Sequence, residues 1–553
     1  MLRKVKWLLP LVFAIIFWQC QGSGNKGTLS GKILSADGKP PVIAHVHLVE
    51  AGGDVFHPFK SVKVNKDGSF RITLPNQKYL DLYITAAFHQ QLEVPLARKN
   101  DHQSVKIDFQ LESYKFKKHF DHVKITGDWN DFAFSTAQPM HKEKDGTFTF
   151  QVKPKADTVA YQLIGLLQKE VSVNGTQYDY LVYDHGGDYK SVLKKTDSVM
   201  TIVFDPQKLP RIYNDALPKV LLKSGSLLTQ DFMDIKLLVD RYLYNFQLAR
   251  LQYRQKFGTD QGFKFDFSEL IKALENKKQE TASKEVKDYI DFQHVLLAGY
   301  GAQVDKAVFQ ELAKNVPLTD PLWSLNPQIM PFVLEKAYGS KKATEMMEKE
   351  FDKIPSKTAR AFILVRSGMQ AKMRHETKKL SDIYNQLKSG YNDVYFVKYY
   401  LKMLNPEARI AVGKPIPDFS FKEMDTGKTI SNKTLKGKFY IMDFWATWCK
   451  PCLGELPGME KAYQKYKDKN FTILSLSFDR SPDDVRKFRK GKFKMPWHHV
   501  FLDKSIRNKV GDEFEVGGIP KPILVSPEGI IIALEGELRG EQLDQTLQKY
   551  LGK

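Results

Sequence analysis

Two cysteines three positions apart, Cys449 and Cys452, are the residues of this chain best suited to chemistry. Two thiols at this spacing can exchange with a disulfide of another molecule, because one attacks and the other resolves the mixed disulfide. Zinc sites use the same spacing, but a structural zinc ion usually needs four ligands. The one remaining cysteine, Cys20, lies far away near the N-terminus. We therefore interpret the pair as a redox-active dithiol that works without a metal or another cofactor.

The predicted elements around the cysteines suit such a dithiol. The apolar run Phe439–Phe444 predicts a strand, and a helical pattern extends from about residue 451 to 467. Cys449 then falls at the helix N-terminus, where unpaired amides and the helix dipole favour a thiolate. Lys450 adds a positive charge beside it. Cys449 is thus predicted to attack and Cys452, inside the first helical turn, to resolve.

The run WATWCKPC at 445–452 resembles the membrane-associated thioredoxin-like thiol-disulfide oxidoreductases of the TlpA and ResA type. The pattern Gly-x-Pro-x-Pro-x-Phe at 413–419 is how that family usually enters its thioredoxin domain. The resemblance covers residues 412–553, about a quarter of the chain. It implies an α/β thioredoxin fold there, with thiol-disulfide exchange as its activity.

The resemblance also implies proton-transfer roles for two acids. Asp443, at the end of the predicted strand, matches the buried acid beneath the disulfide of thioredoxins, although TlpA and ResA relatives more often carry Asn there. Glu455 matches the acid of the CxxE pattern of the ResA type, and positions i and i+3 of a helix share one face with Cys452. Either carboxylate can accept the proton that Cys452 loses when it resolves the mixed disulfide. Which of the two does so is left open.

The client side of the site is assigned by the same resemblance to Trp448, Ile519 and Pro520. Ile519-Pro520 matches the cis-proline loop that faces the dithiol, and an X-Pro bond adopts cis at modest cost. The backbone of Ile519 is expected to pair with an extended client, and Trp448 to shield one side of the dithiol. Pro457 matches the proline that kinks the active-site helix. Lys521 follows Pro520 where Thr is commoner.

Length and composition predict several folded domains. The chain has 553 residues, of which 42% are hydrophobic and 12% aromatic. Its formal net charge is +20, but it contains neither a zinc finger nor a concentrated block of Lys and Arg. We interpret the excess as solvated basic faces, with attraction to an anionic membrane surface as the alternative. No nucleic-acid partner is expected.

The N-terminus predicts export. Three basic residues within the first six positions precede an apolar run from Trp7 to Trp18, which is too short to span a membrane. Cys20 follows directly, as in a bacterial lipoprotein, although the residues before it are larger than usual. We therefore interpret residues 1–20 as a signal peptide of the lipoprotein type, with lipid attached at Cys20. The mature chain is expected to be anchored through lipid in the bacterial cell envelope and to face the periplasm.

The chain before residue 412 is predicted to form three accessory regions. Asp-Gly turns between alternating runs predict a β-sandwich over 27–114, which resembles carboxypeptidase-regulatory-like modules. Residues 115–210 resemble β-sandwiches related to glycogen-binding domains, in which Trp129 and Phe132 could stack on sugar rings. Helical periodicity follows over 226–405.

The expected architecture is therefore multidomain, with all-β sandwich modules, then an α-helical region, then a C-terminal α/β thioredoxin fold. The expected function is thiol-disulfide exchange with exported client proteins. The resemblance favours reduction of their disulfides, with re-reduction by a membrane redox partner, and the opposite direction stays open. The resemblance favours cytochrome c maturation or another exported client. Two alternatives stay open, namely a thiol peroxidase and an envelope glycan- or peptide-binding protein with an accessory redox domain.

Overall fold

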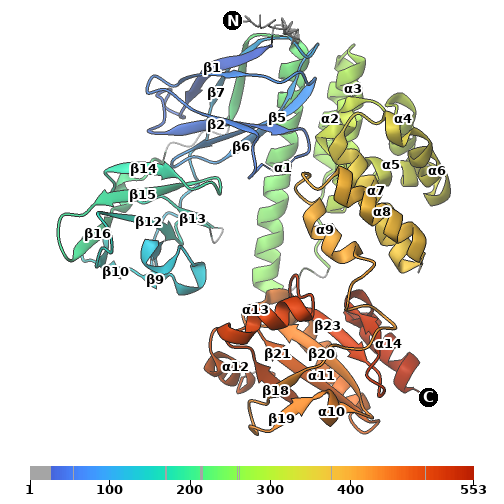
Figure 1. Ribbon diagram of the computed structural model, residues 1–553. Helices are drawn as coiled ribbons and strands as arrows, with labels where there is room; N and C mark the ends of the chain where they lie inside the picture. Colours follow the sequence, from blue (N-terminus) through green and yellow to red (C-terminus); the bar gives the residue numbers. More distant parts are fainter. Residues whose placement is uncertain are drawn as a thin grey trace, which may run out of the picture. The chain divides into compact units, whose positions relative to one another are not determined.

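The computed structural model describes residues 26–552, except 54, 169–170, 212–215, 258–259, 261, 375 and 492 (Figure 1). The predicted signal segment and Cys20 lie outside these residues. The chain forms two compact units that divide between Ile363 and Leu364. The predicted helical region 226–405 therefore contributes helices to both units. No helix among the described residues has the length and apolar composition that a transmembrane span requires.

The first unit begins with a sandwich of two four-stranded sheets, in the orders β17-β7-β1-β4 and β3-β2-β5-β6. Alternate residues of both sheets point inward and share one apolar core, in which Leu29, Val46 and Leu82 are fully buried. The strands are β1 (Thr28–Leu34), β2 (Ala44–Glu50), β3 (Lys60–Lys63), β4 (Ser69–Thr73), β5 (Tyr79–Ala86), β6 (Leu92–Ala97), β7 (Val105–Gln110) and β17 (Lys219–Ser224).

One strand of this sandwich comes from much later in the chain. β17 pairs antiparallel with β7 at the sheet edge, after the whole second module has intervened. No strand was predicted for residues 211–225. Only Val220 of β17 is buried, so the alternation that identifies a strand is too weak to detect in the sequence.

The second module also contains two sheets around one core. The orders are β10-β11-β16 and β14-β15-β12-β8-β9, with β13 pairing to β12. Trp129 does not offer its ring as a sugar platform, because it packs on Gly127 and stacks on Phe150 at 5.3 Å between ring centroids. The strands are β8 (Lys124–Gly127), β9 (Gln138–Pro139), β10 (His141–Lys142), β11 (Phe148–Val152), β12 (Thr158–Ile164), β13 (Ser172–Val173), β14 (Tyr180–Tyr183), β15 (Tyr189–Lys194) and β16 (Met200–Phe204).

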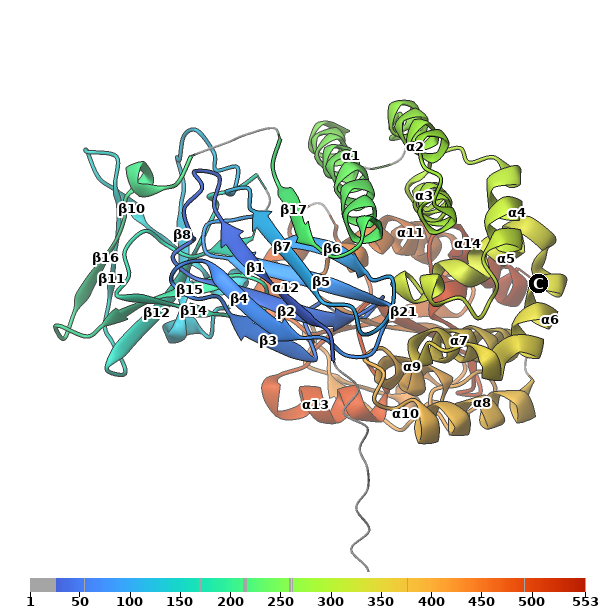
Figure 2. The ribbon, with the colours of Figure 1, turned by 90° about the horizontal axis from the view of Figure 1, so that it is seen from above.

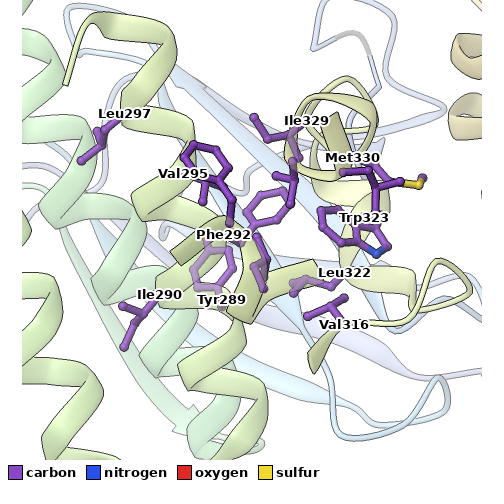
Figure 3. Packing of buried hydrophobic residues seen from close by; sticks show 14 of the residues in the cluster. Tyr289, Ile290, Phe292, Val295, Leu297, Val316, Leu322, Trp323, Ile329 and Met330 are labelled. Carbon is purple, nitrogen blue, oxygen red and sulfur yellow. The ribbon is translucent and has the colours of Figure 1, made fainter. Parts of the chain in front are cut away.

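Helices complete the first unit, and α1 joins them to the first sandwich. Seen from above, α1 lies alongside β6 and β17 (Figure 2). The ring of Phe232 in α1 stacks between those of Tyr79 and Tyr289, with 5.7 Å and 3.9 Å between the ring centroids. Figure 3 shows Tyr289 and Trp323 within the apolar cluster that continues among the helices. These are α1 (Leu227–Phe257), α2 (Ser268–Glu280), α3 (Lys284–Leu296), α4 (Lys306–Asn315), α5 (Ile329–Tyr338) and α6 (Ser340–Glu350).

The second unit contains a five-stranded sheet in the order β22-β21-β20-β23-β24. β20, β21 and β22 are parallel, whereas β23 and β24 run antiparallel to their neighbours. Before it come α7 (Lys357–Met373), which crosses the division, α8 (Thr377–Gly390) and α9 (Val397–Leu404). The strands are β20 (Phe439–Trp445), β21 (Phe471–Ser477), β22 (His498–Phe501), β23 (Lys521–Val525) and β24 (Ile531–Leu534), and a separate hairpin pairs β18 (Ser420–Lys422) with β19 (Thr429–Ser431).

Different helices pack on the two faces of this sheet. One core contains residues of α11, α12 and α14, and the other contains residues of α10 and α13. Successive residues of β20 alternate between these cores, as the two-residue period of a strand requires. Parallel strands alternating with helices give the α/β thioredoxin-like fold expected for residues 412–553. The helices are α10 (Asn432–Leu435), α11 (Lys450–Tyr466), α12 (Pro482–Arg489), α13 (Lys504–Glu513) and α14 (Glu541–Leu551).

Candidate active site

The turn between β20 and α11 holds the cysteines. Thr447 donates from its backbone N to Asp479 Oδ1 at 3.1 Å and from its hydroxyl at 2.6 Å. Asp479 is 1% exposed and follows β21, which pairs in parallel with β20, so the two strand ends meet at one edge. Cys449 is the N-cap residue of α11, with Pro451 in the first turn. The anchored turn thus delivers the first cysteine to the helix N-terminus.

Cys449 and Cys452 form a disulfide, with 2.04 Å between the two Sγ atoms. Cys452 N donates to Cys449 Sγ at 3.2 Å, as expected for a group that caps the helix. Both side chains are nearly buried, Cys449 at 5% exposure and Cys452 at 3%. Trp448 beside them is 59% exposed, so its ring is available to a partner. The structure therefore represents the oxidised state of the dithiol.

A proline loop faces the disulfide. The Ile519–Pro520 peptide bond is cis, and Ile519 O lies 3.7 Å from Cys449 Sγ. Pro520 is buried and Ile519 half-buried. The loop joins α13 to β23, far from the cysteines in sequence. These two residues and Trp448 were predicted from resemblance to lie on the client side. Trp448 precedes Cys449 in the chain, and Ile519 and Pro520 lie in the loop that faces Cys449.

Asp443 lies on the α11 side of β20. Its neighbours at alternate positions, Ile441 and Trp445, belong to the same core as both cysteines. The carboxyl is 1% exposed, and its Oδ1 has no hydrogen-bond partner among the described residues. Burial, reinforced by the nearby Glu455 and opposed by Arg539, raises the pKa of Asp443 to about 7. An acid in this condition can take up and release a proton near neutral pH.

Glu455 is held differently. It is half-buried on α11, and its Oε2 accepts a hydrogen bond from Gly540 N at 3.0 Å. This contact ties the middle of α11 to the segment that precedes α14. Glu455 also acts on the pKa of Asp443, as a negative charge that raises it. The structure therefore brings both predicted acids together, but gives only Asp443 a buried oxygen without a partner among the described residues.

Two residues of the site were not predicted from the sequence. Asp479 anchors Thr447, and Arg539 donates from Nη2 to Pro520 O. A signal for Asp479 existed, because a polar residue directly after a buried strand belongs at the same sheet edge as the cysteines. For Arg539 the sequence offers none, since the contact depends on how residues 535–540 fold back on the proline loop.

The described residues contain no group of three or more His, Cys, Asp or Glu side chains that could hold a metal ion. A CxxC disulfide at the N-terminus of a helix, a facing cis-proline and a buried acid on the central strand define a thioredoxin-fold thiol-disulfide oxidoreductase.

Known proteins agree with this class. A sequence model of the AhpC/TSA family matches residues 412–534. The thiol-disulfide oxidoreductase ResA of Bacillus cereus is 36% identical over 146 residues, which are 26% of this chain and 79% of that protein. The thioredoxin-like protein YneN of Bacillus subtilis is 30% identical over 162 residues, 29% of this chain and 89% of that protein.

Among solved structures, the thioredoxin domain of a thiol-disulfide oxidoreductase from Bacteroides vulgatus is 36% identical. The match covers 26% of this chain and 98% of that domain, with a TM-score of 0.24. From the sequence relatives, the chain belongs to the ResA-type thiol-disulfide oxidoreductases, through its C-terminal domain.

Proposed function

We propose that this protein reduces disulfides of exported client proteins in the bacterial cell envelope, through Cys449 and Cys452. The observation that carries the proposal is the disulfide itself, at the N-terminus of α11 and 3.7 Å from Ile519 O. In that position an extended client can pair with the proline loop while its disulfide meets Cys449. The exposed ring of Trp448 adds an apolar contact for the client.

The reaction has two exchange steps. The Cys449 thiolate attacks one sulfur of the client disulfide, so that a mixed disulfide forms and the other client sulfur leaves as a thiolate. Cys452 then loses its proton and attacks Cys449 Sγ, which releases the second client sulfur. The client gains two electrons and the protein ends as the Cys449–Cys452 disulfide. A membrane redox partner returns two electrons to this disulfide.

Asp443 is the proton acceptor that we favour in the second step. It is buried on the side of β20 whose core contains both cysteines. Its Oδ1, which has no hydrogen-bond partner among the described residues, and its pKa of about 7 suit an acceptor. We do not favour Glu455 as the acceptor, because its Oε2 already accepts a hydrogen bond from Gly540 N. Its role is to raise the pKa of Asp443 through its charge.

Export and lipid attachment belong to the proposal and rest on the sequence of residues 1–20. If Cys20 carries lipid, palmitate labelling of the expressed chain disappears in Cys20→Ala and persists in Cys449→Ser. Labelling that survives Cys20→Ala contradicts the anchor. The regions before residue 412 are proposed to hold the site away from the membrane and to present clients to it.

Trapping tests the activity directly. The full chain with Cys452→Ser is expected to accumulate a mixed disulfide on Cys449 when reduced protein meets an oxidised client, because the resolving thiol is missing. Cys449→Ser is the matched control and should form no such adduct and lose insulin reduction. Full insulin reduction by Cys449→Ser would refute the dithiol mechanism.

Peroxide reduction is the second candidate, and the match to the AhpC/TSA family favours it. Peroxide consumption by the reduced chain separates the two functions. Rapid consumption that survives in Cys452→Ser supports a peroxidase, whereas slow consumption with rapid insulin reduction supports the oxidoreductase.

A further inference from the structure

A pocket of about 540 Å³ lies in the first unit, where the two β-modules meet. Its volume is within the range of sites that bind small molecules, and such sites often occur at boundaries between modules. One wall comes from β2 and β3 of the first sandwich, and the other comes from β14 of the second module (Figure 1). None of the described residues that line it belongs to the candidate active site.

The register of β2 and β3 determines which side chains line the first wall. His45 pairs opposite Lys63, and His47 pairs opposite Ser61. Because alternate residues of a strand share one face, these four side chains lie together and line the pocket. Val46, between the two histidines, is buried in the apolar core on the other face. The sheet thus presents a polar and aromatic surface to the second module.

Tyr183 of β14 forms the opposite wall. Its ring centroid lies 5.2 Å from that of His45 and 5.0 Å from that of His47. On the exposed side, the ring of His185 meets the ring of Tyr183 edge-on at 5.1 Å. Flat rings therefore line both sides of the pocket, and such surfaces favour a ligand that is itself flat.

Hydrogen bonds fix the two inner imidazoles. His45 Nδ1 lies 2.9 Å from the Tyr189 hydroxyl. His47 Nδ1 lies 2.8 Å from Ser61 Oγ, and its Nε2 lies 3.2 Å from Thr85 Oγ1. Burial lowers the pKa of both histidines to about 4, so both rings are neutral at neutral pH. These two rings therefore give the pocket shape and polarity but no charge.

A buried donor without a partner lies behind His47. Tyr83 of β5 pairs opposite His47, and the two ring centroids are 5.6 Å apart. Tyr83 is 2% exposed, and its hydroxyl has no hydrogen-bond partner among the described residues. Buried polar groups are normally hydrogen-bonded. A ligand oxygen that enters beside His47 can supply the missing acceptor.

Lys63 supplies the positive charge of the pocket. It is exposed, and its Nζ has neither a hydrogen-bond nor an ion-pair partner among the described residues. No acidic side chain is among the described residues that line the pocket. Asp184, the next residue after Tyr183, is used within its own turn, where Oδ1 accepts from Gly186 N at 2.7 Å. A pocket lined by one sign of charge favours a ligand of the opposite sign.

We propose that this pocket binds a small aromatic acid, with its ring packed against Tyr183 and its acid group paired with Lys63. A neutral sugar fits less well, because the described lining contains no carboxylate or amide side chain to hold neighbouring hydroxyl groups. The proposal adds a binding site in the first unit and does not depend on the chemistry of Cys449 and Cys452.

Equilibrium dialysis of the full chain with naphthalene-2-carboxylate tests the pocket. Binding should saturate, and naphthalene-2-carboxamide, which has the same shape without the charge, should bind about tenfold more weakly. Lys63→Met should weaken carboxylate binding by a similar factor and leave amide binding unchanged. Tyr183→Ala should weaken the binding of both compounds by about threefold or more, because both lose the ring contact.

Lys60→Met and Tyr180→Ala are the matched controls. Lys60 is on β3 but three residues from Lys63, so its side chain lies on the other face of the strand. Tyr180 is an exposed tyrosine of β14 that does not line the pocket. Neither change should alter the affinity for the carboxylate. An equal loss of affinity in Lys60→Met and Lys63→Met overturns the proposal.

Three further results would also contradict an aromatic-acid site. These are the absence of saturable carboxylate binding, equal affinities for the carboxylate and the amide, and an unchanged carboxylate affinity in Lys63→Met. Maltohexaose provides the sugar arm: if it binds, loses affinity in Tyr183→Ala and the carboxylate does not bind, the pocket is a sugar site instead. If Tyr183→Ala fails to fold, the comparison of Lys63→Met with Lys60→Met decides, since both replace a lysine of the short strand β3.

Discussion

Asp443 in the second unit and Asp188 in the second β-module are two buried aspartates with similar acidity. The pKa of Asp443 is raised to about 7 and that of Asp188 to about 8, in both cases mainly by burial. Each has an acid nearby that raises the pKa further, Glu455 for Asp443 and Asp184 for Asp188. By acidity alone the two sites are alike.

Their hydrogen bonds differ. Asp188 accepts from Tyr189 N at 2.8 Å through Oδ1 and from the Tyr114 hydroxyl at 3.1 Å through Oδ2. Asp443 has a buried oxygen without a partner among the described residues and shares its core with a disulfide. A raised pKa therefore does not by itself indicate function. A buried acid with its oxygens bonded stabilises a turn, whereas one left unbonded beside reactive sulfur costs stability and is available for a proton.

The largest effect expected from this difference is on turnover. Asp443→Asn should slow client reduction by about 10²–10⁴-fold, the range for loss of a general acid or base. Asp188→Asn should leave the rate unchanged, although it alters an acid with an equally raised pKa. Single-turnover mixing of reduced protein with insulin or another disulfide client measures both.

Glu455→Gln is the control within the site. It removes the charge that raises the pKa of Asp443 but keeps an oxygen that can accept from Gly540 N. The rate should fall far less than in Asp443→Asn. A larger loss in Glu455→Gln would assign the proton-accepting role to Glu455 instead.

The sequence was sufficient for those parts of the site that are local. The strand, the cysteines and the helix are consecutive, so Cys449 at the N-terminus of α11 was predicted within one residue. Ile519, Pro520 and Asp443 were predicted through resemblance. In the structure Ile519 O lies 3.7 Å from Cys449 Sγ, and Asp443 lies on the face of β20 whose core contains the cysteines. Arg539 and β17 were missed for one reason, since each acts through a contact with a distant segment that no local periodicity reports.

The raised pKa of Asp443 also makes the stability of the second unit depend on pH. The pKa of Asp443 is higher in the folded state than the ordinary value of 3.8, so the folded chain binds more protons between pH 3.8 and about 7. Its contribution to folding free energy is therefore fully present below pH 3.8 and is lost as pH rises through 7. A shift of this size corresponds to roughly 4 kcal/mol. Asp443→Asn, whose amide does not titrate, should remove this loss of folding free energy with rising pH.

Hydrogen exchange resolves this effect by region. Protection of peptides from β20 and α11 should be equal in the unaltered protein and Asp443→Asn near pH 4, and higher in the variant at pH 8. Asp188→Asn offers the parallel test in the first unit, where the window ends near pH 8. A gain in Asp443→Asn that stays constant across this range contradicts the assignment of the raised pKa to Asp443.

The smallest expected effect tests the hydrogen bonds themselves. Near pH 4, where neither buried acid has lost its proton, Asp188→Ala leaves Tyr189 N and the Tyr114 hydroxyl without their acceptor, and should cost about 1–3 kcal/mol of unfolding free energy in the first unit. Asp443→Ala removes a carboxyl whose Oδ1 has no hydrogen-bond partner among the described residues, so at the same pH it should cost the second unit less. Urea unfolding followed by hydrogen exchange in each unit gives the two values. Equal destabilisation by both variants would mean that Asp443 is a structural acid like Asp188, and that its unpaired oxygen has no bearing on the dithiol.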